Sequence, residues 1–176
     1  MKIKSTKFND LKVISSPIHS DKRGSFREVL SKKNLFNKKF VFTCASVSKK
    51  NVMRGLHLQT KNAQGKYLTV LKGEIFDVAL DLRNNSKSFG KYFSINLSDK
   101  NGLSIYIPAG FAHGFLALKK NNIVTYSCTN YRSEKHELGI IWNDKDLAIK
   151  WPVKKPLVSK KDQNNLSLSE YVKIYK

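Results

Sequence analysis

The sequence lacks several features that would place it in a familiar class of protein. Its 176 residues include only two cysteines, Cys44 and Cys128, and four prolines. Both cysteines lie in apolar, strand-like surroundings, which favours buried free thiols over a disulfide. No apolar run approaches the roughly 20 residues of a membrane helix, and the basic stretch 1–10 has no apolar core of a signal peptide. We therefore expect a cytoplasmic, soluble protein that contacts no membrane.

Acidic residues are also scarce, with 13 against 33 lysines and arginines, for a formal net charge of +20. Such a balance invites a nucleic-acid interpretation. However, only five of the basic residues are arginines, and the lysines occur in scattered pairs where turns are expected. That is the pattern of a solvated surface, so we do not expect nucleic acid as the main partner. The charge would still steer an anionic substrate toward the protein.

Helical periodicity is scarce as well, and alternation of apolar and polar residues runs through most of the chain. It predicts about ten short strands with turns every eight to twelve residues or so, a spacing typical of an antiparallel sandwich or barrel, most simply a jelly roll. Short helices are expected only at 34–39 and at about 168–175. The predicted strands are 11–14, 25–30, 40–48, 52–59, 66–71, 74–82, 90–98, 103–107, 115–118 and 123–129.

No internal repeat, low-complexity segment or linker interrupts this pattern. We therefore expect one domain over residues 1–176, with an irregular, basic C-terminal tail from about residue 152. Barrels of this kind leave edge strands exposed, and dimerisation is a common way to cover them, so a homodimer is expected.

One stretch, 52–59, reads Val-Met-Arg-Gly-Leu-His-Leu-Gln. A strand that only packed a core would not need Arg54 and His57 on either side of a glycine. Alternation assigns Arg54 and Leu56 to one face, and Gly55 and His57 to the other. Gly55 leaves the His57 face open, with room for a flat ligand. On this stretch alone, a half-exposed histidine on an ordinary strand explains the residues as well as a site does.

A second stretch, 107–115, reads Ile-Pro-Ala-Gly-Phe-Ala-His-Gly-Phe. Its Pro-x-Gly-x-x-His pattern at the start of a strand resembles the second motif of the cupins. In metal cupins the first motif supplies two histidines and a carboxylate, whereas this chain offers His57-Leu58-Gln59. These ligands are too few for a tight metal site. We expect no metal or other cofactor, which leaves the histidines free for acid–base chemistry.

Taken in order, these and other stretches resemble one family, the dTDP-4-dehydrorhamnose 3,5-epimerases, which are metal-independent cupins. The resemblance implies an all-β cupin jelly-roll barrel with short peripheral helices. It also implies an isomerase that epimerises C3 and C5 of a dTDP-4-keto-6-deoxy sugar on the way to dTDP-L-rhamnose. It runs from about residue 12 to 162 and is carried by 21–24 with Glu28, 54–57, 63–66, 73–83, 107–115, Tyr126 with 129–131, 142–144, 151–152 and 159–162.

Removing a hydrogen next to a ketone leaves an enolate. The reaction therefore needs a base on one face of the sugar, an acid on the other, and positive charge at the 4-oxygen. The resemblance implies that His57 is the base, oriented by Asp162 as in other His–Asp pairs. It implies that Tyr126 is the acid on the opposite face and that Lys66 stabilises the enolate.

The resemblance also implies how a nucleotide diphosphate sugar is held. Arg23, Arg54 and Glu28 would orient it, since the planar fork of arginine suits a diphosphate. His113 would line the floor of the pocket, and Tyr131 would pack near the sugar or the nucleotide.

Each assignment has an ordinary structural alternative. Lys66 suits a surface position on a strand, Tyr126 suits a core, and Asp162 suits a polar tail. His113 also suits a core, as a histidine whose hydrogen bonds are satisfied there. Only the joint occurrence of these residues favours the catalytic interpretation.

The chain departs from the family pattern near the nucleotide. Where the family has Gln-x-Asn, residues 42–44 are Phe-Thr-Cys, whose side chains cannot supply amide hydrogen bonds. His19 stands where phenylalanine is common, and Arg132 where a second tyrosine is common. The nucleotide and the exact sugar therefore stay open. A monoepimerase, a ketoisomerase and a non-catalytic sugar-binding cupin stay as alternatives.

Overall fold

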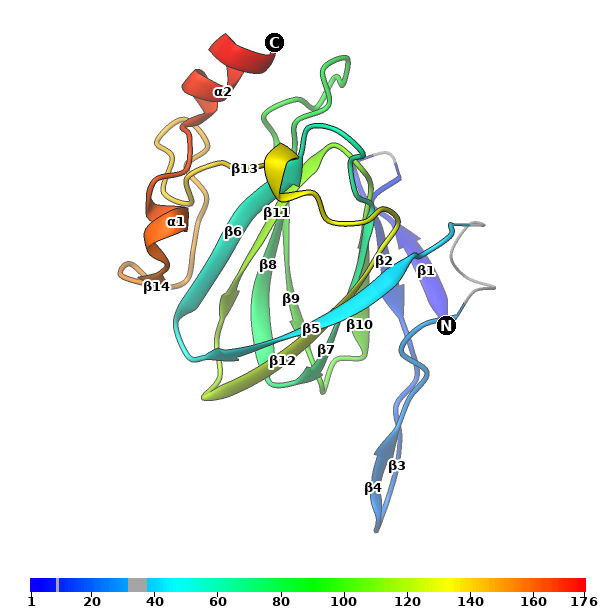
Figure 1. Ribbon diagram of the computed structural model, residues 1–176. Helices are drawn as coiled ribbons and strands as arrows, with labels where there is room; N and C mark the ends of the chain where they lie inside the picture. The colour runs from blue at the N-terminus through cyan, green and yellow to red at the C-terminus, as the bar shows by residue number, and fades with distance from the viewer. Residues whose placement is uncertain (9, 32–37) are drawn as a thin grey trace.

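The computed structural model describes residues 1–8, 10–31 and 38–176, and most of its regular structure is strand (Figure 1). The expected all-β class is therefore confirmed. The helical turn expected at 34–39 falls mainly on residues outside the described part of the chain.

Two antiparallel sheets face each other. The first has the order β1 (Lys2–Ser5), β2 (Lys12–Ser15), β10 (Leu103–Ile107), β7 (Lys66–Lys72), β12 (Asn121–Cys128) and β5 (Phe42–Lys49). The second has the order β13 (Glu137–Gly139), β6 (Val52–Gln59), β11 (Phe111–Ala117), β8 (Glu74–Asp81) and β9 (Tyr92–Ser98). Strand β14 (Leu157–Val158) adds to β6 in parallel.

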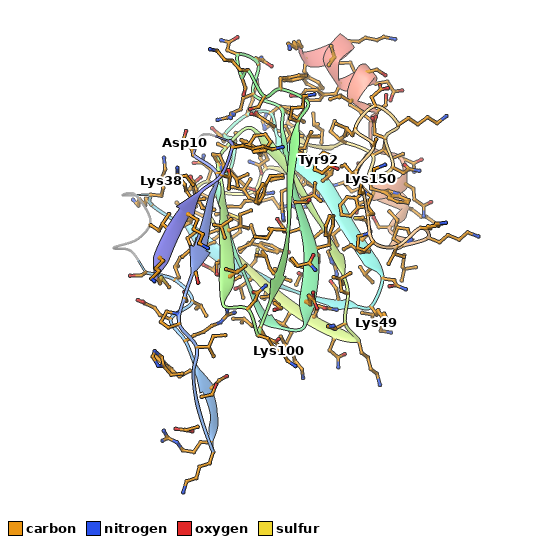
Figure 2. All side chains as sticks on the ribbon, turned by 180° about the vertical axis from the view of Figure 1, so that it is seen from behind. Asp10, Lys38, Lys49, Tyr92, Lys100 and Lys150 are labelled. Carbon is orange, nitrogen blue, oxygen red and sulfur yellow. The ribbon has the colours of Figure 1, made fainter. Side chains whose placement is uncertain are left out.

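Alternation along β8 shows how the chain builds two apolar layers. Ile75 and Ala79 point into the core between the sheets, and Val78 and Leu80 point to the other side. There they pack under the C-terminal segment, which contributes Tyr171. Figure 2 shows side chains filling the space between the sheets.

A 3-10 turn, η2 (Glu134–His136), precedes β13. The C-terminal segment lies beside β6 and carries two helices, α1 (Lys160–Gln163) and α2 (Leu168–Tyr175) (Figure 1). Helix α2 begins with a capping box between Ser167 and Glu170 and has the predicted bounds. None of the helices in the described part of the chain has the length and apolar character to traverse a lipid bilayer.

A hairpin of β3 (His19–Asp21) and β4 (Gly24–Phe26) projects away from both sheets (Figure 1). Arg23 pairs with Asp21 at its tip, and the Arg23 side chain is 85% exposed. The strand expected at 25–30 is therefore too long, because β4 ends at Phe26. Strands β1, β3, β13 and β14 and helix α1 were not predicted.

The alternation expected around Gly55 is wrong. His113 of β11 lies opposite His57, and Phe115 lies opposite Arg54, so two residues of β6 face the single residue between them. This β-bulge shifts the phase of the strand by one residue. As a result Arg54 and His57 line the same cavity instead of lying on opposite faces.

Candidate active site

A cavity of about 760 Å³ opens between the two sheets. From the second sheet it is lined by Arg54, His57 and His113, and from the first by Lys66 and Tyr126. Asp162 of α1 reaches the same cavity. Six of the residues singled out from the sequence therefore share one space, with His57 and Tyr126 on opposing sheets.

His57 and Asp162 form a close pair. Asp162 Oδ1 accepts a hydrogen bond from His57 Nε2 at 2.6 Å, and Asp162 Oδ2 accepts one from the Gly55 amide at 3.3 Å. The Asp162 side chain is 6% exposed, whereas that of His57 is 28% exposed toward the cavity. Burial raises the pKa of the Asp162 carboxyl, but the hydrogen bonds outweigh it and leave the pKa below its usual value. The carboxylate therefore stays charged beside the imidazole.

The C-terminal segment delivers Asp162 to this pair. Leu157 of β14 donates its amide to the Asn51 carbonyl at 2.8 Å, which ties the segment to the start of β6. Ser159 then caps α1, accepting a hydrogen bond from the Asp162 amide at 3.1 Å. A two-residue strand and a four-residue helix thus place the Asp162 carboxylate beside a histidine that lies more than a hundred residues earlier in the sequence.

A second histidine is held in the same way. Asp77 Oδ2 accepts a hydrogen bond from His113 Nε2 at 2.7 Å, and both side chains are buried. Asp77 stands on β8 and His113 on β11, directly beside His57 in register. The pair presents a fixed imidazole edge to the cavity.

On the first sheet, burial shifts the pKa values of Lys66 and Tyr126 in opposite directions. It lowers the pKa of the Lys66 ammonium below its usual value. It raises the pKa of the Tyr126 phenol, an effect that the Ser46 hydroxyl opposes. Near neutral pH the phenol is thus a proton donor, as an acid must be before it acts.

Sequence reasoning missed a charged cluster at the cavity. Glu137 accepts hydrogen bonds from Arg132 Nε at 2.8 Å and from Lys161 Nζ at 2.6 Å. Burial raises the pKa of Glu137, but these two cations outweigh it and hold the pKa at about 2. The basic C-terminal tail therefore contributes Lys161 to the site. The scarcity of acidic residues was the one signal that could have drawn notice to Glu137.

Phe42 and Cys44, which depart from the family pattern, lie on the cavity wall, whereas His19 lies on the projecting hairpin. Phe42, Cys44 and Cys128 all line the cavity, and both thiols are free. Burial raises the pKa of Cys44, and raises that of Cys128 to about 11, so both remain protonated. Phe42 stacks on the exposed ring of Tyr131, with centroids 6.3 Å apart and planes 8° apart. This wall is apolar and aromatic where amides were expected.

Arg23 and Glu28 do not reach the cavity of their own chain. Arg23 sits at the tip of the projecting hairpin, and Glu28 is exposed just beyond it (Figure 1). Nor do the described residues contain a group of three or more histidine, cysteine, aspartate or glutamate side chains placed to hold a metal ion.

Comparison with known proteins agrees with this architecture. Residues 5–170 match the family described as dTDP-4-dehydrorhamnose 3,5-epimerase. A protein of that name from Methanothermobacter thermautotrophicus is 41% identical over 165 residues, covering 90% of this chain and 89% of the relative. One from Shigella flexneri is 40% identical over 171 residues, covering 93% and 94%.

Solved structures agree as well. A dTDP-6-deoxy-D-glucose-3,5-epimerase from Legionella pneumophila, in complex with dTDP-4-keto-L-rhamnose, superposes with a TM-score of 0.90 at 38% identity. The match covers 96% of this chain and 93% of that one. The expected cupin-type fold is confirmed by this likeness.

Proposed function

Because the chain belongs to the dTDP-4-dehydrorhamnose 3,5-epimerase family and is an isomerase, we propose that it converts dTDP-4-dehydro-6-deoxyglucose to dTDP-4-dehydrorhamnose by inverting C3 and C5. One observation carries this proposal. His57 and Tyr126 line a single cavity from opposing sheets, with Asp162 bonded to the histidine. A base and an acid so arranged act on opposite faces of one sugar ring.

In the first step His57 takes the proton from the carbon beside the ketone. The imidazole becomes an imidazolium, which the Asp162 carboxylate stabilises at 2.6 Å. Because Asp162 also binds the Gly55 amide, the ring is held in one orientation throughout.

The electron pair left on carbon moves onto the 4-oxygen as an enolate. Lys66 supplies charge-assisted hydrogen bonding there, and its partly buried position strengthens that interaction. His113, held by Asp77, supplies a second contact with the sugar from the cavity floor.

Tyr126 then gives its phenolic proton to the carbon from the opposite face, so the centre is inverted. The sugar loses one proton and gains one, while the imidazolium returns a proton to solvent and the phenolate regains one. Repetition at the second carbon completes the reaction. The raised pKa of Tyr126 keeps the phenol protonated beforehand.

The nucleotide diphosphate occupies the basic side of the cavity in this proposal. Arg54, Arg132 and Lys161 supply the charge, and arginine suits a diphosphate because its planar fork donates two hydrogen bonds at once. Phe42 and Tyr131 give the base an aromatic surface on which to stack.

In a homodimer, Arg23 and Glu28 can contribute to the binding of the nucleotide sugar. The hairpin that carries Arg23 reaches the cavity of a second copy, since it projects away from its own (Figure 1). Exposed apolar side chains support a partner surface: Phe26 on the hairpin is 73% exposed, and Val47 and Leu71 on the first sheet are 69% and 45% exposed.

The test is incubation with dTDP-4-keto-6-deoxyglucose in D2O, followed by NMR. We expect deuterium at both C3 and C5 in the unmodified protein, and neither exchange nor product in His57→Asn. His136→Asn, outside the cavity, is the matched control and keeps full activity. Label at one carbon alone would make the protein a monoepimerase, and no label would refute the proposal.

A further inference from the structure

The Ser46 hydroxyl is a buried polar group that the mechanism above leaves unused. Along β5, Cys44, Ser46 and Ser48 face inward, because the residues between them are exposed. Ser48 Oγ accepts a hydrogen bond from Arg54 Nε at 2.9 Å. Ser46 Oγ, by contrast, is buried without a hydrogen-bond partner among the described residues. An unpaired buried hydroxyl destabilises a fold, so some other role must account for it.

Register places this hydroxyl next to the proposed acid. Val124 of β12 lies opposite Ser46, and Tyr126 lies opposite Cys44. Ser46 and Tyr126 are therefore diagonal neighbours on the inward face of one strand pair, a separation that an aromatic side chain spans.

The Ser46 hydroxyl affects the pKa of the Tyr126 phenol. Burial raises the pKa of Tyr126, and Ser46 acts in the opposite direction as a hydrogen-bonding group. The other groups that act on the phenol are Cys44 and Cys128, which raise its pKa, and Arg54, which lowers it. Within the described part of the chain, however, the Ser46 hydroxyl has no hydrogen-bond partner. The Ser46 hydroxyl is therefore a neighbour of the Tyr126 phenol and is available to donate a hydrogen bond to it.

We propose that Ser46 is a positioning residue for Tyr126, whose hydroxyl donates a hydrogen bond to the phenolate oxygen formed when Tyr126 protonates the sugar. The inference rests on the proposed function. In the step, the phenolic O–H bond breaks, a C–H bond forms on the enolate carbon, and the negative charge passes to the phenolate. Ser46 keeps its own proton throughout.

Such a bond strengthens as the reaction proceeds, because a hydroxyl binds an anionic oxygen about twice as strongly as a neutral one. It therefore lowers the barrier of the inverting step more than it stabilises the resting enzyme. A hydroxyl that is poorly satisfied before the reaction suits this role. Abstraction of the sugar's proton by His57, by contrast, takes place on the opposing sheet, away from Ser46.

The first experiment separates the two proton transfers in Ser46→Ala. Deuterium that enters with retention of configuration reports abstraction by His57, and inverted product reports protonation by Tyr126. We expect inversion to slow about 10- to 100-fold, the loss of one hydrogen bond to a charged group, while exchange with retention continues. Ser46→Thr keeps the hydroxyl and restores inversion.

Ser16→Ala is the matched control, because Ser16 Oγ is also buried and unpartnered among the described residues but follows β2, which does not pair with the strand of Tyr126. It leaves both rates unchanged. Inversion at the normal rate in Ser46→Ala overturns the proposal. So does a parallel loss of exchange and inversion, which is what a merely structural role would produce.

A second experiment needs no substrate. The ultraviolet titration of Tyr126 is obtained as the difference between a protein and the same protein carrying Tyr126→Phe. Since Ser46 lowers the pKa of the phenol, Ser46→Ala shifts this titration to higher pH. An unmoved titration in a protein that does epimerise overturns the inference alone. A protein that neither exchanges nor inverts overturns the proposed function, and the inference with it.

Discussion

Buried carboxylates hold their neighbours in place throughout this molecule, although acidic residues are few. Asp162 and Asp77 each fix a histidine of the cavity, and Asp81 fixes the loop after β8. A charge taken out of water is costly unless it is paired and hydrogen-bonded. Removing the partner of such a carboxylate therefore costs more than removing a surface ion pair.

Asp81 gives the protein a specific dependence of stability on pH. Burial raises its pKa, but hydrogen bonds from Arg83, Ser86 and Ser88 outweigh it and hold the pKa at about 2, below the usual 3.8. A pKa lowered on folding stabilises the folded state above the unfolded value, and this is lost as pH falls through the folded value. We expect roughly 2 kcal/mol of unfolding free energy to disappear between about pH 4 and pH 2.

Urea unfolding at a series of pH values measures this loss. Asp81→Asn removes the titrating group, so its stability changes less across the same window. Asp146→Asn, at an exposed position, serves as the control and follows the unmodified protein. An equally steep loss in Asp81→Asn would contradict the assignment.

Regular elements with a strong local pattern could be predicted from the sequence. The bounds of β6 and β10 match the predicted strands, and those of α2 match the predicted helix. In each case the signal is contained in the element: alternation in the strands, and periodicity after a capping serine in α2. Two-residue β14 and lysine-rich β1 carry no such signal, because a partner strand defines them.

The β-bulge in β6 shows the limit of alternation. A bulge depends on the partner strand, so the residues of β6 alone do not reveal it. A Cβ on Gly55 would lie 2.5 Å from the carbonyl oxygen of His113 and 2.6 Å from the Gly114 Cα. The glycines permit this close approach of two backbones. Their presence was visible in the sequence, but the change of phase was not.

Many residues of the site could be predicted only through resemblance to a family. Their arrangement in space could not be predicted, because it depends on the folded structure. No local pattern joins Asp162 to His57, and the link depends on β14 docking against β6. Lys161 was hidden among many surface lysines. Arg23 could be located on a turn, but the direction of its hairpin is a property of the folded chain (Figure 1).

The docking of β14 is testable with a pair of proline substitutions. Leu157→Pro removes the amide that binds the Asn51 carbonyl, so the segment that carries Asp162 loosens. Because Leu157 is 65% exposed, little packing is lost. We expect kcat to fall about 10²- to 10⁴-fold, as when a histidine loses its aspartate, with the thermal unfolding of the barrel little changed.

Lys160→Pro is the matched control. Lys160 is the first residue of α1, where proline is tolerated, and Ser159 before it is extended. This variant keeps its activity. Equal activity of the two variants would show that β14 does not position Asp162.

At the scale of the whole molecule, the hairpin predicts active sites shared between two chains. Arg23→Ala and His57→Asn each disable the epimerase in this arrangement. A mixed dimer contains one cavity with an intact His57 and an intact hairpin from the other chain. Random pairing makes about half of the dimers mixed, and each mixed dimer has one intact site out of two. The sample should therefore show about a quarter of full activity.

Co-expression of the two variants, followed by assay of the mixture, makes the measurement. The separately purified variants, mixed just before the assay, are the control for residual activity. Activity of the co-expressed sample no higher than the control average would mean that Arg23 serves its own chain or none.

If Asp162 acts as proposed, its position also determines when a newly made molecule becomes active. The ribosome synthesises every strand of the two facing sheets up to β13 before it reaches the short β14 and α1 segment. A nascent polypeptide can thus complete its barrel while His57 still has no carboxylate beside it. A chain that ends after residue 156 lacks Asp162 and also Tyr171, which packs in the second apolar cluster, so we expect it to be inactive. In the proposed mechanism, activity therefore depends on a segment that is synthesised after the strands of both facing sheets.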